Sequence, residues 1–71
     1  MSVASVIETS ATSQTSFEDA IQQGVARATK TLKNVQGAWI KEQQVSIENG
    51  RISGYRVNLM VTFVLDGNVD D

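Results

Sequence analysis

Apolar and polar side chains alternate strictly between residues 54 and 65. The odd-numbered positions are all apolar or aromatic, whereas the even-numbered positions mix charged, amide, hydroxyl and apolar groups. The odd-numbered residues are Tyr55, Val57, Leu59, Val61, Phe63 and Leu65. Because successive side chains of a strand point to opposite faces, this pattern predicts a strand with one wholly apolar face and one mixed face. This strand is roughly twice the usual length of about six residues. We expect another element to cover the apolar face, and we expect function on the mixed face.

The preceding segment, residues 35–48, predicts a second strand whose apolar positions change parity. They are even-numbered in its first half and odd-numbered in its second half: Ala38 and Ile40, then Val45 and Ile47. A uniform strand would bury opposite parities at its two ends, so we predict a β-bulge or sharp bend within residues 41–44. Asn49-Gly50 follows and is typical of a type I′ turn, in which both central residues have positive φ. Residues 35–48 and 51–65 are therefore predicted to form a long antiparallel hairpin.

A helix is predicted before this hairpin from apolar residues spaced three and four positions apart. It begins near Thr15 or Ser16, where a carboxylate follows the hydroxyl three residues later, the spacing of a capping box. The apolar stripe consists of Phe17, Ala20, Ile21, Gly24, Val25, Ala28 and Leu32. Gly24 costs up to about 1 kcal/mol relative to alanine. Either it lets the sheet approach the helix closely, or the position simply tolerates glycine.

A weaker alternation over residues 3–10 predicts a first strand, joined to the helix by a polar connection over residues 11–14. The order is then β-α-β-β, an α+β fold in which a three-stranded antiparallel sheet packs its apolar face on one helix. Residues 1–71 are predicted to form a single domain, with residues 66–71 a mobile acidic tail. Because one helix is too narrow to cover so long a hairpin, the remaining apolar surface must meet solvent, a ligand or another subunit.

The amino-acid composition restricts the possible chemistry. The sequence has no cysteine and no histidine, which excludes disulfides, His/Cys zinc sites, thiol nucleophiles and imidazole bases. A chain of 71 residues buries a modest core and usually needs an additional constraint, and self-association is the common one that remains. We therefore predict a homo-oligomer that is not an enzyme. A catalytic carboxylate pair, such as Glu42 with Glu48, is the disfavoured alternative.

Charge and hydropathy restrict the partners. The formal net charge is −2, the pI is about 4.9, and no basic cluster is available to follow a phosphate backbone, so nucleic acid is not expected as a partner. No segment approaches the roughly 20 apolar residues of a membrane span. Residues 1–6 lack the basic start and long apolar run of a signal peptide. The expected location is cytoplasmic.

Three stretches of the sequence, taken together with the β-α-β-β order, point to one family. They are Ala-Thr-Ser-Gln-Thr-Ser-Phe-Glu-Asp-Ala at 11–20, Ala-Arg-Ala at 26–28 followed by Thr31, and the alternating apolar residues of 55–65. Over about residues 3–67 the chain resembles the dodecin family. The resemblance implies a three-stranded antiparallel sheet wrapped around one helix, and twelve subunits forming a hollow sphere with cubic 23 symmetry. It also implies that riboflavin or FMN binds in pairs at two-fold interfaces, for storage and protection from light without turnover.

The sequence departs from that family at the residues that contact flavin. In flavin-binding dodecins a tryptophan on the second strand stacks on the isoalloxazine ring, and a glutamine on the third strand hydrogen-bonds its polar edge. Gly37 stands here at the tryptophan position, Trp39 at the position of a following glutamate, and Arg56 at the glutamine position. Stacking depends on offset, and arginine donates hydrogen bonds but accepts none. Flavin binding is therefore expected to be weak or absent, with FMN as the residual candidate because its phosphate can pair with Arg56 or Lys41.

The predicted ligand-binding residues are Gly37, Trp39, Lys41, Glu42 and Arg56, and no catalytic or metal site is assigned. The favoured function is a homododecamer that binds or sequesters a small ligand. The alternatives are an assembly that binds no flavin and a protein-interaction module that uses the mixed face. Two of these residues have an alternative role. Trp39 is either a ligand-binding residue or an anchor between subunits. Arg56 either contacts a ligand or forms an intersubunit ion pair with Glu42 or Glu48.

Three further predictions concern aromatic residues, a methionine and the acidic end of the sequence. Tyr55 and Phe63 are expected in the core, and Met60 on the mixed face is expected to make an adaptable subunit contact. Asp66-x-Asn68-x-Asp70 matches the opening of a calcium loop but lacks the glycine and the distal glutamate, so a free acidic tail is expected. Calcium or magnesium bound by carboxylates that symmetry gathers remains a minor alternative.

Overall fold

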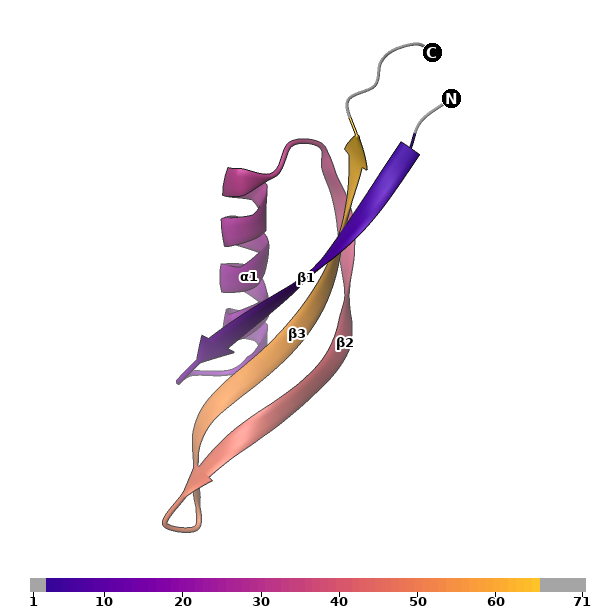
Figure 1. Ribbon diagram of the computed structural model, residues 1–71. Helices are drawn as coiled ribbons and strands as arrows, with labels where there is room; N and C mark the ends of the chain where they lie inside the picture. The colour runs from indigo at the N-terminus through magenta and orange to yellow at the C-terminus, as the bar shows by residue number, and fades with distance from the viewer. Residues whose placement is uncertain (1–2, 66–71) are drawn as a thin grey trace.

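The computed structural model describes residues 3–65, which form one helix and three strands (Figure 1). The elements are β1 (Val3–Ser13), α1 (Phe17–Thr31), β2 (Val35–Glu48) and β3 (Arg51–Leu65). The strands form one antiparallel sheet in the order β1-β3-β2, so that β3 is central. The predicted α+β fold with β-α-β-β order is confirmed. The predicted acidic tail, residues 66–71, lies outside the described residues.

The first strand extends further than its sequence pattern predicted. Residues 11–13 were expected in a polar connection, but Ala11 pairs with Val57 and Ser13 pairs with Tyr55, so β1 continues to Ser13. Small side chains carry little hydrophobic signal, which is why the alternation was missed there. Ser13 is buried, and its Oγ donates to Asp19 Oδ2 at 2.6 Å and accepts from the Thr15 backbone N–H at 2.9 Å. The end of β1 is thereby fixed to the start of the helix.

The helix begins at the second of its two predicted start positions. Ser16 is the N-cap, and its Oγ accepts a hydrogen bond from the Asp19 backbone N–H at 3.0 Å. The reciprocal half of the capping box is absent, because the Asp19 carboxylate accepts from Ser13 Oγ and from Gln23 Nε2, each at 2.6 Å. Ser13 takes over the missing half, since its Oγ accepts from the Ser16 backbone N–H at 3.4 Å.

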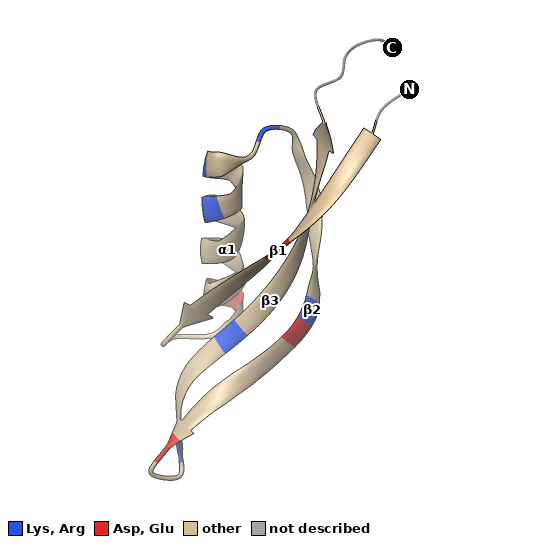
Figure 2. Ribbon diagram, viewed as in Figure 1, with Lys and Arg blue, Asp and Glu red and all other residues tan. Residues whose placement is uncertain are grey.

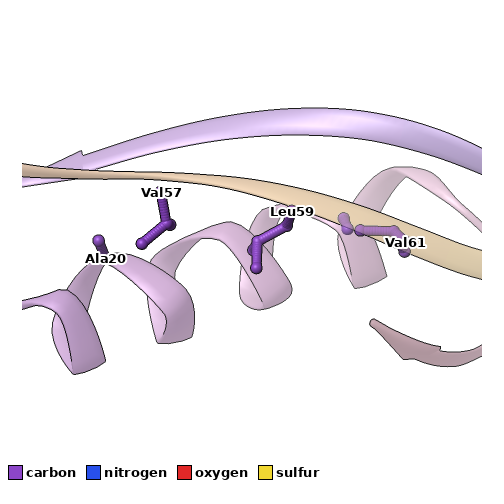
Figure 3. Close-up of a cluster of buried hydrophobic side chains, with 5 residues drawn as sticks. Ala20, Val57, Leu59 and Val61 are labelled. Carbon is purple, nitrogen blue, oxygen red and sulfur yellow. The ribbon is translucent and has the colours of Figure 1, made fainter. Parts of the chain in front are cut away.

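The core lies where α1 crosses the odd-numbered face of β3. Val57, Leu59 and Val61 are almost fully buried, together with Ala20 and Ala28 of the helix (Figure 3). Gly24 makes this close approach possible: a Cβ added to it would lie 2.7 Å from Leu59 Cδ1 and 3.3 Å from Ala11 Cβ. Of the two interpretations of this glycine, close approach of the sheet is therefore the one that the structure supports.

The hairpin has the predicted turn and the predicted bulge. Asn49 and Gly50 both have positive φ, 53° and 75°, as a type I′ turn requires. The register shifts between Ile40 and Glu42, which leaves Lys41 as the extra residue within the predicted range. Two other shifts, at Val35/Gly37 and Ser46/Ile47, were not predicted.

The subunit is elongated rather than compact. Its radius of gyration is 14.9 Å and its extents are 56 × 18 × 13 Å, whereas a compact chain of this length has a radius near 11 Å. The hairpin projects well past the helix (Figure 1), and Ile47 and Ile52, paired near its end, are more than half exposed. One helix does not cover the sheet, as the length of the hairpin predicted.

Two aromatic residues predicted in the core lie at its border. Tyr55 and Phe63 are only partly buried. Tyr55 packs edge-on against Phe17, with ring centroids 5.1 Å apart and an interplanar angle of 78°. Both residues flank the stretch that α1 covers, so their burial is limited by the length of the helix.

Candidate functional site

The predicted site residues lie on the face of the sheet that points away from α1. In the register of the hairpin, Gly37 pairs with Thr62, Trp39 with Met60 and Glu42 with Asn58. Directly paired residues share a face of a sheet, and these partners are even-numbered residues of β3, opposite the buried face. Arg56 is an even-numbered residue of the same strand. We name this surface the open face: even-numbered residues of β1 and β3 and their partners on β2.

Trp39 is the large aromatic group of the open face. Its side chain is 52% exposed, and the half-buried Met60 lies beside it on β3. Gly37, two residues earlier and about 7 Å away along the strand, leaves space next to it. No heavy atom lies within 4 Å of the position where a Gly37 Cβ would be. Trp39 therefore offers an accessible ring with open surface beside it.

Lys41 reaches the open face because of the bulge. Its Nζ crosses β3 and lies 3.3 Å from Glu8 Oε1, an ion pair between exposed side chains. The other carboxylate oxygen, Glu8 Oε2, accepts from Asn58 Nδ2 at 2.9 Å. The hydrogen bond from Asn58, and then the hydrogen bond and positive charge of Lys41, lower the pKa of Glu8 below its ordinary value. One polar cluster, Glu8, Lys41 and Asn58, thus links all three strands.

Arg56 lies on the same face but apart from Trp39. Its Nε donates to Ser10 Oγ at 3.3 Å. Arg56 is four residues from Met60, the partner of Trp39, which is about 13 Å along the strand. Figure 2 shows a basic position on the middle of β3, with an acidic and a basic position on the neighbouring part of β2. The structure therefore brings all five predicted residues to one face, but it does not bring them into one tight pocket.

Sequence reasoning missed three residues of this face. Glu8, Ser10 and Asn58 each hydrogen-bond one of the basic groups or one another. The sequence did contain a signal for Glu8, because it is the only charged residue between positions 3 and 13. It pairs with an even-numbered residue of β3 and therefore lies on the face away from the buried odd-numbered residues. Its partners, however, lie 33 and 50 residues away in the sequence.

A hollow lies on the helix side of the sheet. It has a volume of about 250 Å³ and is mostly apolar, between the second half of α1 and the beginning of β2. Its lining residues are Val25, Ala28, Thr29, Val35, Gln36, Gly37, Ala38 and Val61. Gly37 is the one predicted site residue among them, whereas Trp39, Lys41, Glu42 and Arg56 do not line this hollow.

Neither a metal centre nor a membrane span is found in residues 3–65. No group of three or more acidic, histidine or cysteine side chains is arranged there to hold an ion. Within the same residues, no helix is long and apolar enough to cross a bilayer. The calcium-loop-like residues Asp66, Asn68 and Asp70 lie outside the described part of the chain.

Comparison with known proteins places the chain in a family. A dodecin from Thermus thermophilus, solved as a single-residue mutant, is 34% identical with a TM-score of 0.88, over 94% of this chain and 100% of that one. The dodecin from Streptomyces davaonensis is 29% identical with a TM-score of 0.87, over 93% and 97%. Calcium dodecin from Mycobacterium tuberculosis, a calcium-chelating antigen with a calcium-binding site, is 31% identical with a TM-score of 0.79, over 97% and 99%.

Comparison with curated protein sequences gives no significant match. The model of the dodecin family, in contrast, matches residues 3–66, nearly the whole sequence. Together with the shared fold and the identity of 34% to the Thermus thermophilus dodecin, this match shows that the chain belongs to the dodecin family.

Proposed function

We propose that this protein is a hollow homododecamer that holds a small planar ligand against Trp39 on the open face. Dodecins are ligand-binding proteins without enzymatic activity, and they form dodecamers that bind flavins or calcium. The shape of the subunit supports assembly. The chain is 56 Å long, and Ile47 and Ile52 near the end of the hairpin are more than half exposed, so apolar surface is available for contact with neighbouring copies. The cubic 23 symmetry that the resemblance implies belongs to the same proposal.

The exposed ring of Trp39 carries the ligand part of the proposal. A tryptophan that is 52% exposed on a sheet face leaves a large apolar plane to be covered. Gly37 provides space beside that ring, and the Glu8, Lys41 and Asn58 cluster provides hydrogen-bonding groups next to it. A planar ring that stacks on Trp39 and presents polar atoms toward β3 matches this arrangement.

Riboflavin and FMN are the first ligands to test. The stacking plane is displaced by two residues from the flavin-binding pattern, and Arg56 replaces a side chain that both donates and accepts, so the expected affinity is lower than that of a member with both contacts. Titrating each flavin with micromolar protein should quench flavin fluorescence. Trp39→Ala is the control that removes the ring. Full emission of both flavins with the unchanged protein would contradict a flavin ligand and leave a non-flavin assembly.

Two alternatives give different results in simple measurements. A protein-interaction module that uses the open face predicts a smaller oligomer, which sizing distinguishes from an assembly of twelve 7.7-kDa chains. Calcium or magnesium binding rests on the relative from Mycobacterium tuberculosis and on Asp66, Asn68 and Asp70, and titration calorimetry with each cation tests it. The cytoplasmic location and the single-domain organisation over residues 1–71 stay predictions.

A further inference from the structure

Glu8 lies in line with Trp39 across the open face. Glu8 of β1 pairs with Met60 of β3, and Met60 pairs with Trp39 of β2, so the three side chains form one cross-strand row. Neighbouring strands lie about 4.8 Å apart, which places the Glu8 and Trp39 backbones about 10 Å from each other. A ring that stacks on Trp39 and extends over Met60 therefore approaches the Glu8 carboxylate.

Both oxygens of this carboxylate are held in place. Oε1 lies 3.3 Å from Lys41 Nζ, and Oε2 accepts from Asn58 Nδ2 at 2.9 Å. These two contacts also favour the charged form of Glu8, whose pKa lies below the ordinary value. At neutral pH a charged carboxylate that is paired with Lys41 thus lies at one end of the row that Trp39 begins.

The ion pair with Glu8 also engages Lys41, the basic residue nearest to Trp39 in the sequence. Lys41, two residues after Trp39, directs its ammonium group to Glu8, so the positive charge is compensated within the subunit. The next basic group on this face, Arg56, lies about 13 Å along the sheet from the row of Trp39. Glu42, paired with Asn58, adds another negative charge to the open face. An anionic group close to Trp39 would therefore meet the carboxylate of Glu42 and a lysine that is already paired with Glu8.

We infer that Glu8 determines the charge specificity of the Trp39 site: by holding Lys41 in an ion pair across β3, it makes the site favour neutral planar ligands over their phosphorylated counterparts. This inference rests on the proposed ligand site at Trp39. It revises the expectation from sequence that the phosphate of FMN pairs with Lys41, because the ion pair to Glu8 was not visible in the sequence.

Riboflavin and FMN test this inference as a matched pair of probes, since they share the ring system and differ by one phosphate. Fluorescence quenching gives a Kd for each flavin with the unchanged protein, with Glu8→Gln and with the control Glu18→Gln. The control makes the same change in net charge at an exposed position of α1, the helix that covers the opposite face of the sheet. Circular dichroism and sizing confirm that each variant keeps its fold and assembly.

The expected result is a change in the ratio of the two affinities. Glu8→Gln frees Lys41 and removes a repulsive charge, so it should tighten FMN binding relative to riboflavin by about fivefold at low salt. That gain should shrink at high salt, and Glu18→Gln should leave the ratio unchanged. Lys41→Met is a second variant that leaves the carboxylate uncompensated, and it should shift the ratio further toward riboflavin, which keeps the test open if Glu8→Gln fails to fold.

The negative outcomes separate the inference from the proposed function. If flavins bind but the FMN-to-riboflavin ratio is the same in the unchanged protein, Glu8→Gln and Lys41→Met, the specificity role of Glu8 is overturned while the ligand site stands. If neither flavin is quenched by any of these proteins, a flavin-like ligand at Trp39 is excluded, and the inference is overturned with it.

Discussion

The two faces of β3 differ in how they are covered. On one face, Val57, Leu59 and Val61 are almost fully buried under α1 of the same chain. On the other face, the even-numbered residues of β3 pair with polar side chains such as Glu8 and Glu42, with the exposed Val6 and with the exposed Trp39 of the flanking strands. One face of β3 thus packs within the chain, whereas the other face is left largely open by it. Substitutions on the two faces should therefore differ in kind, in stability on one side and in binding on the other.

The largest difference is expected between two adjacent residues of β3. Leu59→Ala removes a side chain that is almost fully buried and should lower the free energy of unfolding by about 2–5 kcal/mol. Met60→Ala, on the open face, should cost about 1 kcal/mol or less. Urea unfolding at one fixed protein concentration measures both, since assembly links stability to concentration. Equal losses for the two variants would contradict the division between the faces.

Removing the ring of Trp39 should affect binding and leave the fold intact. Stacking contributes about 0.5–1.5 kcal/mol beyond the burial of area, so Trp39→Ala should weaken a stacked ligand at least about twofold, and further through the lost burial of area. The unfolding midpoint should change little, because the side chain is half exposed in the subunit, and the assembly should be unchanged if Trp39 serves the ligand alone. Sizing and ligand titration of the same sample distinguish the two roles of this residue. A variant that falls apart into smaller species would identify Trp39 as a subunit anchor instead.

Gly24→Ala tests how closely the helix approaches the buried face. The added Cβ would lie 2.7 Å from Leu59 Cδ1, and such overpacking costs about 1–3 kcal/mol. Alanine gains up to about 1 kcal/mol in helix propensity, so the net effect should be a loss of about 1 kcal/mol. Combining it with Leu59→Ala should relieve the clash and make the double variant more stable than additivity predicts. A stabilised single variant would show that the glycine is merely tolerated.

The smallest expected effect concerns the pH dependence that Glu8 adds to stability. Its pKa is lowered in the folded protein, so its contribution is fully present above the ordinary value of 4.5 and is lost as the pH falls through the folded pKa. The stability difference between the unchanged protein and Glu8→Gln should therefore be small at pH 7 and smaller still at pH 3. Thermal unfolding at both values measures it. A difference that is the same at both pH values would mean that the carboxylate charge does not stabilise the open face.

The buried face was predictable because local patterns determine it. The alternation of residues 55–65, the hydroxyl of Ser16 and the Asn49-Gly50 turn each report on neighbours close in the sequence, and each prediction is confirmed. The change of parity in β2 also located the bulge at Lys41. The extension of β1 through Ser13 was missed because alanine, threonine and serine leave almost no hydrophobic signal, although they continue the pairing with β3.

The open face was predictable only in part because distant pairing creates it. The five predicted residues do share one face, which follows from the alternation within β2 and β3. The partner of Lys41, however, depends on the register between β1 and β3 and on the direction that the bulge gives to its side chain. Neither property can be obtained from local sequence. The contacts of Glu8 with Lys41 and Asn58 therefore follow only from the three-dimensional arrangement of the three strands.

Native mass spectrometry of protein purified without chelator tests most directly whether the chain assembles with other copies and retains a ligand. We predict a single assembly of twelve 7.7-kDa chains, about 92 kDa, with additional mass from a retained small ligand. A stable, folded species of 7.7 kDa that carries no ligand would contradict the proposed assembly and the proposed site on the open face together.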